Sequence, residues 1–257
     1  MSIVISYFVY SQRDGYDIHP GFKSQMLRLG VIAEVYLDNP KASPSVQALI
    51  EPMAKSREEK VMILSTHEQI LNGQVFEGCR NPSAHAYRSK LVQYTMKIGH
   101  ALMNRGVVGH FAIDYLVTID NDDNNTLLTG IEINLRQGGT THPFATMALL
   151  CGGNVDPEGI FRTTEGHLRC YIATDNYFDE GLKFVSVDHF LCHLQEEAAL
   201  LHPTRWDSER KTGVVFHMLG YLSHGKIGFT AIGSSSLEAQ TLFDETIFFL
   251  RRDAGKP

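Results

Sequence analysis

The sequence predicts an α+β fold with a largely antiparallel sheet flanked by helices. Strand-like segments occur in neighbouring pairs with short polar links, at 46–50 and 61–65 and again at 110–118 and 127–135. Consecutive strands joined in this way usually pair antiparallel. Helical periodicity separates such pairs, most clearly after Ser83, where apolar residues recur at 87, 91, 94, 98 and 102. Of the 257 residues 43% are hydrophobic and 20% charged, so the chain can bury a core.

The individual elements follow from local patterns. In the N-terminal part we expect a strand at 1–10, a loop at 11–17, a helix at 20–29 ended by Gly30, a strand at 31–37, and a loop at 72–80 after the first strand pair. Ser83 is expected to cap the long helix, and Gly106 to end it. Further along we expect a helix from Thr140 or Thr141 to about 150, a strand at 168–173, a helix at 187–201, strands at 214–219 and 227–232, and a helix at 237–250. Phe248 and Phe249 are expected in the core.

Composition limits the classes of protein to consider. The net charge is −6, from 23 basic and 29 acidic residues, which argues against a nucleic-acid partner. Four widely spaced cysteines without a C-x-x-C pair argue against a zinc ribbon and for a reducing compartment. No apolar stretch is long enough to cross a membrane. We therefore expect a cytoplasmic protein, with an unassigned segment at 1–20, a main portion at 21–202 and a β-β-α module at 203–257.

The most informative residues lie in the predicted strand pair 110–118 and 127–135. Asp114 interrupts an apolar strand, where a carboxylate is costly unless it is paired or ligated. Glu132 and Asn134 are two residues apart on the next strand, so both point to one face, and Arg136 continues that face. An antiparallel pairing would bring Asp114 opposite Glu132 or Asn134.

Two interpretations of this cluster are open. Two carboxylates and an amide oxygen suit Mg²⁺, which takes oxygen ligands and is usually completed by substrate phosphates. Arg136 would then contact the same phosphates, and the Gly138–Gly139 loop would offer backbone N–H groups to an anion. Alternatively, the four side chains form a salt-bridge cluster on a solvated sheet face.

The ordered set Asp114 followed by E-x-N-x-R (Glu132, Asn134, Arg136) resembles the ATP-grasp superfamily. The run IEINLRQGGTTHPFATMALLCGG and the later CYIATDNY are similar to ATP-grasp peptide (carboxylate–amine) ligases of the pheganomycin-synthesis type. SPSVQ, LSTHEQIL and GVVFHMLGYLSHGKIGFTAIG fit the same group, so that the resemblance covers roughly residues 20 to 250.

The resemblance implies an ATP- and Mg²⁺-dependent ligase that joins a carboxylate to an amine through an acyl phosphate. Asp114, Glu132 and Asn134 would hold Mg²⁺ between the ATP phosphates, and Arg136 would be catalytic, stabilising the transferred phosphoryl group. Glu34 resembles the hinge that lines the adenine or ribose pocket. The partners implied are ATP and small carboxylate and amine substrates, such as amino acids or peptides.

Other polar residues are candidates for ligand contact, each beside a simpler interpretation. His67 is a candidate for a substrate carboxylate or phosphate, or else a solvated loop residue. Thr140, Thr141 and His142 are placed to contact a ligand over a helix start, although threonine also caps helices. Arg80 is either a second phosphate-side cation or a surface arginine. Asp175 and Asn176 either line the amine-substrate pocket or form a turn.

The resemblance is to the C-terminal half of the ATP-grasp fold. ATP-grasp enzymes clamp ATP between two subdomains, and the N-terminal one supplies phosphate-binding lysines. Here Lys23 is the one lysine in the first 30 residues. The chain is therefore expected to be a fragment of a longer ligase, a truncated gene product, or a protein that uses the half-fold otherwise. Its expected macromolecular partner is the missing N-terminal half or a second copy of the chain. Two alternative functions stay open: a non-catalytic interaction or regulatory module, and an ATP-grasp phosphotransferase.

Overall fold

The computed structural model describes residues 20–30, 37, 40–53, 60–73, 75–119, 126–198 and 206–253. The chain divides into two compact units, Met1–Asn39 and Pro40–Pro257. In the first unit the structure describes helix α2 (Pro20–Leu29), followed by Gly30 with a φ of +77°. This helix and its glycine end confirm the prediction. The strand and loop expected at 1–10 and 11–17 lie outside the described residues, as does 31–36 of the strand expected at 31–37.

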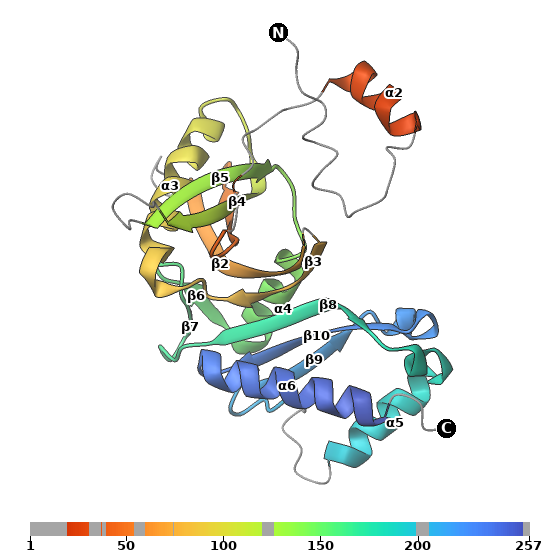
Figure 1. Ribbon diagram of the computed structural model, residues 1–257. Helices are drawn as coiled ribbons and strands as arrows, with labels where there is room; N and C mark the ends of the chain where they lie inside the picture. Colours follow the sequence, from red (N-terminus) through yellow and green to blue (C-terminus); the bar gives the residue numbers. More distant parts are fainter. Residues whose placement is uncertain are drawn as a thin grey trace. The chain divides into compact units, whose positions relative to one another are not determined.

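The second unit is built on one eight-stranded sheet, in which all neighbouring strands pair antiparallel (Figure 1). The strand order is β5-β4-β1-β2-β3-β8-β10-β9. The strands are β1 (Pro44–Ile50), β2 (Val61–Asn72), β3 (Val75–Asn81), β4 (Gly109–Ile119), β5 (Thr126–Asn134), β8 (Cys170–Phe178), β9 (Gly213–His217) and β10 (Lys226–Gly233). Strands β6 (Gly153–Val155) and β7 (Phe161–Thr163) form a separate pair.

Helices cover this sheet at both ends of the strand order (Figure 1). They are α3 (His85–Met103), α4 (Thr141–Cys151), α5 (Val187–Ala198) and α6 (Ser236–Asp253), with short 3₁₀ helices η1 (Glu180–Phe184) and η2 (Leu219–His224). The predicted fold class, a mostly antiparallel sheet flanked by helices, is therefore confirmed.

Helix α3 packs on β1 and β2 and closes the first core. Alternate residues of β1 and β4 are buried on this side; they are Val46, Ala48, Ile50, Phe111, Ile113, Tyr115 and Val117. Because successive side chains of a strand point to opposite faces, the residues between them point away from α3. We call the face opposite α3 the site face; it carries Gln47 of β1 and Asp114 of β4.

Helices α4 and α6 cover opposite faces of the β8–β10 part of the sheet. Phe229 and Ala231 of β10 pack with Leu242 of α6. Ile232, next in sequence, belongs to a different core cluster together with Met147 of α4. The alternation along β10 therefore sorts its side chains between the two helices, and both faces are buried here.

The loop expected at 72–80 is wrong, since residues 75–81 form β3 between β2 and β8. Of the two glycines that suggested a loop, Gly73 does lie in the turn, with a φ of +63°. Gly78 lies within the strand, where an added Cβ would be 2.1 Å from the carbonyl oxygen of Ala173. This glycine marks a close approach of two strands.

The cap expected at Ser83 is also wrong. Helix α3 begins at His85 with Ala84 as its N-cap residue, and no side chain caps it. The Ser83 hydroxyl is buried, without a hydrogen-bond partner among the described residues. Gly106 does follow the helix end with a φ of +82°, as predicted.

The C-terminal β-β-α arrangement is present as β9, β10 and α6. Strand β10 also pairs with β8, so this arrangement continues the main sheet. The boundary between 202 and 203 stays a prediction, because pairing alone does not define where a domain begins.

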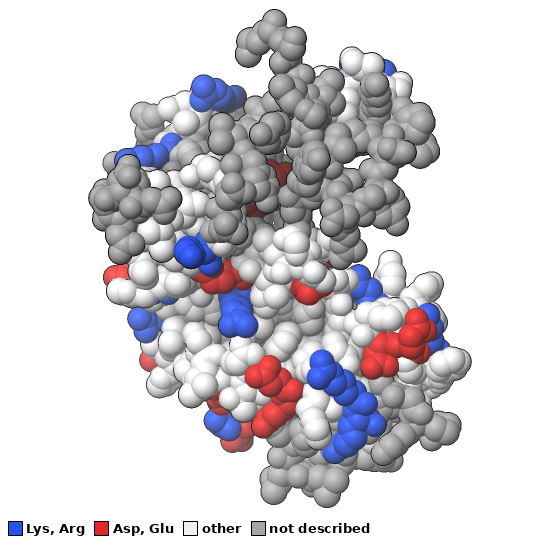
Figure 2. Space-filling model, in the orientation of Figure 1, with Lys and Arg blue, Asp and Glu red and all other residues white. Residues whose placement is uncertain are grey.

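Charges of both signs are interspersed on the face of the described residues shown in Figure 2. Several form exposed pairs, such as Arg210 with Glu238 at 3.0 Å and Lys211 with Glu165 at 3.3 Å. Such exposed pairs contribute little to stability. Among the helices that the structure describes, none has the length and apolar character needed to span a membrane.

Candidate functional site

Asp114 and Glu132 lie opposite each other on neighbouring strands. β4 and β5 pair antiparallel, in a register that also sets Ala112 opposite Asn134. Side chains two residues apart on a strand share a face, so Asp114, Glu132 and Asn134 all belong to the site face. The strand pairing predicted from the sequence is confirmed. The role of these three residues as metal ligands stays a prediction.

The carboxylate of Asp114 is the electrostatic centre of this group. Gln69 donates to its Oδ1 at 2.7 Å, and Asn134 donates to its Oδ2 at 3.2 Å. Burial, and then the negative charge of Glu132, raise the pKa of Asp114 to about 6, although Gln69 and Arg136 act in the opposite direction. Asp114 is half-buried and Glu132 is exposed, and the negative charge of Glu132 opposes ionisation of Asp114.

This donor set fits Mg²⁺. The candidate ligands are two carboxylates and one amide. Among the described residues, no three His, Cys, Asp or Glu side chains gather as a metal site. Mg²⁺ is commonly bound by one or two carboxylates and completed by phosphate and water oxygens. Besides burial, the charge of Glu132 raises the pKa of Asp114, and the charge of Arg136 lowers it. A divalent cation between Asp114 and Glu132 would relieve the repulsion between the two acids.

The loop after β5 is held to the site face by Gln47 of β1. Gln47 donates through Nε2 to the hydroxyl of Thr140 and accepts through Oε1 from the hydroxyl of Thr141, both at 2.7 Å. The same Thr141 oxygen accepts from the backbone N–H of Gly138 at 3.0 Å. One glutamine thus orients two hydroxyls and closes the glycine loop beside the acids.

Two expectations for this loop need correction. Thr140 is the N-cap residue of α4, but its side chain makes no capping bond because it is engaged by Gln47. The Gly138 N–H, which we expected to be available for an anion, is already bonded to Thr141. Arg136 is exposed and donates to the Gln137 carbonyl at 3.1 Å.

His67 is buried in strand β2, and the expectation of a solvated loop residue is wrong. Its Nε2 lies 2.6 Å from the hydroxyl of Tyr171, and its Nδ1 has no partner among the described residues. Burial lowers the pKa of His67 to about 3, so the ring is neutral at pH 7. In the present arrangement it lies beneath the surface.

Arg80 is not brought together with the acids. It is exposed and lies opposite Glu68 and Ile172, whereas its neighbour Cys79 lies opposite Gln69 on the site face. Alternation along β3 therefore sends Arg80 to the other side of the sheet. Glu34, the expected hinge residue, lies outside the described residues.

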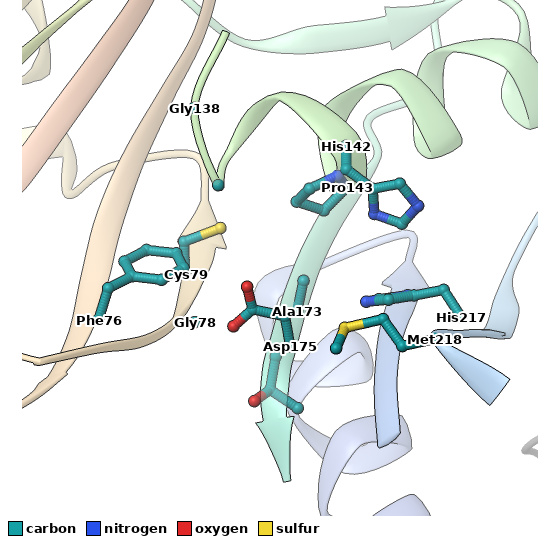
Figure 3. A pocket seen from close by; sticks show the side chains of 12 residues that line it. Phe76, Gly78, Cys79, Gly138, His142, Pro143, Ala173, Asp175, His217 and Met218 are labelled. Atoms are coloured by element: carbon teal, nitrogen blue, oxygen red, sulfur yellow. The ribbon is translucent and has the colours of Figure 1, made fainter. Parts of the chain in front are cut away.

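Next to the glycine loop is a pocket of about 190 Å³ (Figure 3). Its lining comes from β3, β8, the loop, the start of α4 and the end of β9: Phe76, Gly78, Cys79, Gly138, Gly139, His142, Pro143, Ala173, Thr174, Asp175, His217 and Met218. The predicted residues Gly138, Gly139 and His142 thus line this pocket, whereas Asp114, Glu132 and Asn134 are not part of its lining. The site has two neighbouring parts joined by residues 136–142.

Sequence reasoning missed Gln47 and Gln69 as parts of the site. Both lie on the site face because of their positions in β1 and β2, and each contacts a predicted site residue. A signal was present, since both are polar within apolar strands. Without the strand order, however, nothing indicated which residues they would meet.

Comparison with known proteins identifies the family. The model of the family described as "IQCH-like, ATP-grasp" matches residues 2–158. The chain belongs to this ATP-grasp family. The resemblance predicted from the ordered acid, amide and arginine positions is confirmed.

One relative of this ATP-grasp chain is the L-propargylglycine–L-glutamate ligase of Streptantibioticus cattleyicolor. The two are 27% identical over 215 residues, which are 83% of this chain and 42% of that ligase. The ATP-grasp chain therefore spans less than half the length of the curated relative it matches.

Solved structures resemble the fold of this ATP-grasp chain. The ATPase subunit of phosphoribosylaminoimidazole carboxylase from Aquifex aeolicus is 13% identical, with a TM-score of 0.50 over 84% of this chain and 58% of that one. Carboxyaminoimidazole ribonucleotide synthase from Aspergillus clavatus, complexed with ATP, is also 13% identical, with a TM-score of 0.49 over 84% of this chain and 52% of that one. At such identities the likeness concerns the fold alone.

Proposed function

We propose that this chain is the Mg²⁺- and nucleotide-binding portion of an ATP-dependent carboxylate–amine ligase. Membership of the ATP-grasp family and the ligase relative support this proposal. The observation that carries it is the pair Asp114 and Glu132, set opposite each other on neighbouring strands with Asn134 beside them, where Asp114 is half-buried and Glu132 is exposed.

Each residue of this group would have a distinct role in binding the metal or the phosphates. Asp114, Glu132 and Asn134 would hold Mg²⁺, which when bound supplies positive charge against the ATP phosphates. Gln69 holds the carboxylate of Asp114 in place through its 2.7 Å hydrogen bond. Arg136, on the exposed side, would place its guanidinium against the phosphoryl group being transferred.

The proposed reaction has two steps. A carboxylate oxygen of the first substrate attacks the γ-phosphorus of ATP, and ADP leaves. The amine of the second substrate then attacks the acyl carbon, and inorganic phosphate leaves with the former carboxylate oxygen. Arg136 would stabilise the negative charge that develops on the transferred phosphoryl group in the first step.

Nucleotide binding is tested by thermal unfolding of the full chain. Mg²⁺ and ATP together are expected to raise the melting temperature, because a ligand that binds only the native state at about 100 times its Kd adds about 2.7 kcal/mol. For a chain of this size that corresponds to a shift of roughly 5–10 °C. The double variant Asp114→Asn/Glu132→Gln should lose the shift, yet unfold without ligand no earlier than the parent, since the repulsion is gone.

The matched control is Glu158→Gln/Asp188→Asn, which makes the same charge change at two exposed positions. It should keep the ligand-induced shift. Equal shifts in the parent and in Asp114→Asn/Glu132→Gln, or no shift in the parent, would contradict the assignment of these acids.

The acyl phosphate is tested with carboxylate substrates labelled with ¹⁸O. Incubation with ATP, Mg²⁺ and a panel of amino acids should give an amide, and one ¹⁸O atom per turnover should appear in inorganic phosphate. A phosphoester product would instead indicate a phosphotransferase. Nucleotide binding without any product would leave this chain as a binding module that does not catalyse ligation by itself.

A further inference from the structure

The pocket beside the glycine loop is a separate site from the acid pair. It lies between β3, β8, the first turn of α4 and the end of β9, and Gly138 of its lining is two residues from Arg136. Its volume of about 190 Å³ is below the roughly 300–1,000 Å³ of pockets for drug-sized ligands. This size suits a single small molecule.

The lining of this pocket contains one charged side chain, the carboxylate of Asp175. In Figure 3, Asp175 lies between Phe76 and Cys79 on one side and His217 and Met218 on the other. Among the described residues no hydrogen bond or ion pair engages this carboxylate. Burial, followed by the charge of Asp175, raises the pKa of the Cys79 thiol, so the thiol stays neutral. The pocket therefore presents an uncompensated negative charge.

The imidazole of His217 does not balance that charge. The rings of His142 and His217 meet edge to face with their centroids 4.4 Å apart. Burial, and then the neighbouring His142, lower the pKa of His217 to about 4, which leaves it neutral at pH 7. Its Nδ1 is buried without a partner among the described residues. Gly228 makes room for this ring, because a Cβ there would lie 2.3 Å from Nε2.

We propose that this pocket binds the amine-bearing substrate of the ligase, an amino acid or the amino end of a short peptide, through a salt bridge between its ammonium group and Asp175. The negative lining attracts a cation and repels a carboxylate. The apolar walls at Phe76, Pro143 and Met218 suit the rest of a small molecule. This inference rests on the proposed function, since it concerns the amine substrate of the proposed ligase. The glycine loop connects the pocket to the acid pair.

The test measures binding without ATP or Mg²⁺. Met218 is one of eight methionines, and its methyl group gives a local NMR signal in protein labelled with ¹³C-methyl methionine. Met218→Leu assigns that signal by its loss. L-Alaninamide, which has an ammonium group and no carboxylate, is expected to shift it saturably. N-Acetyl-L-alaninamide, which has no ammonium group, should not.

Asp175→Asn should weaken L-alaninamide binding at least tenfold, whereas the exposed control Asp188→Asn should leave the Kd unchanged. If the other methionine signals show that Asp175→Asn is misfolded, Asp175→Glu replaces it, and binding should be weakened yet still depend on the ammonium group. Equal binding of the acetylated compound, an unchanged Kd in Asp175→Asn, or no shift of the Met218 signal would overturn the proposal.

Failure of this inference is distinguishable from failure of the proposed function. The variant Asp114→Asn/Glu132→Gln should bind L-alaninamide as the parent does, since neither acid lines the pocket. Amine binding without a nucleotide-induced thermal shift would support the pocket and contradict the ligase. A thermal shift without amine binding would support the ligase and contradict the proposed role of the pocket.

Discussion

At the scale of single residues, the environment of Asp114 bears on its proposed role in metal binding. Its carboxylate is held by Gln69 and Asn134 and faces Glu132, whose negative charge raises its pKa, while the charge of Arg136 lowers it. A half-buried carboxylate beside a second acid is unfavourable unless a positive group is bound. The two acids in this position support the proposed role in binding a positive group.

His67 makes a prediction about stability and pH. Its pKa falls from 6.5 to about 3 on folding, so between these values the unfolded chain binds a proton that the folded chain does not. The contribution of His67 to the free energy of unfolding is complete above about pH 6.5. It decreases by roughly 1.4 kcal/mol per pH unit as the pH falls toward 3. Urea unfolding at pH 7, 6 and 5 should show this slope, and His67→Gln should reduce it.

The control for His67 is His85→Gln, which changes an exposed histidine at the start of α3. This variant is expected to keep the parental slope. His217, whose pKa is also lowered, contributes to the slope in both variants. An unchanged slope in His67→Gln would mean that the ring is accessible to protons in the folded state.

At the scale of single elements, helix α6 shows what a sequence pattern leaves undecided. Phe248 and Phe249 are adjacent, and both were expected in the core. Phe249 is 1% exposed and packs against Phe190 and His193, whereas Phe248 is 63% exposed, which corrects the expectation for that residue. Adjacent positions on a helix point about 100° apart, so only one of the two can point directly at the sheet.

This pair allows a matched test. Phe249→Ala should lower the free energy of unfolding by about 3–5 kcal/mol, because it leaves a cavity in the core. Phe248→Ala should change it by no more than about 0.5 kcal/mol. Chemical denaturation of both variants measures the difference, and similar losses in the two would contradict the packing of α6.

Strand β3 is a second element that the sequence pattern predicted wrongly, because a loop was expected where a strand is found. Its glycines suggested a loop, yet Gly78 lies within the strand because β8 approaches too closely there for a side chain. Glycine serves turns and close approaches alike, and the local sequence does not distinguish the two. The neighbouring strand is nearly 100 residues away in sequence, so only the folded chain shows why the glycine is needed.

At the scale of the whole molecule, the site depends on the order of the strands. Gln47, Gln69 and Asp114 come from three strands whose neighbours in the sheet are not all neighbours in sequence. The β4–β5 hairpin alone would bring the acids together. The strands β1 and β2 add the glutamines that orient Asp114 and the glycine loop. Asp114 and the glycine loop are thereby held in place by hydrogen bonds from other strands.

The sequence alone determined the local features of this protein. Period-2 and helical patterns predicted α2, α3, the hairpin of Asp114 and Glu132, and the α+β class, because these depend on contacts between residues close in the chain. The ordered acid, amide and arginine positions also sufficed to indicate the ATP-grasp family.

The tertiary structure decided which distant residues meet. It turned Arg80 away from the acids, buried His67 against Tyr171, and closed a pocket around Asp175 and His217. Strand order and sheet face set these relations. These relations depend on how the whole core is buried. A local sequence pattern carries no information about that.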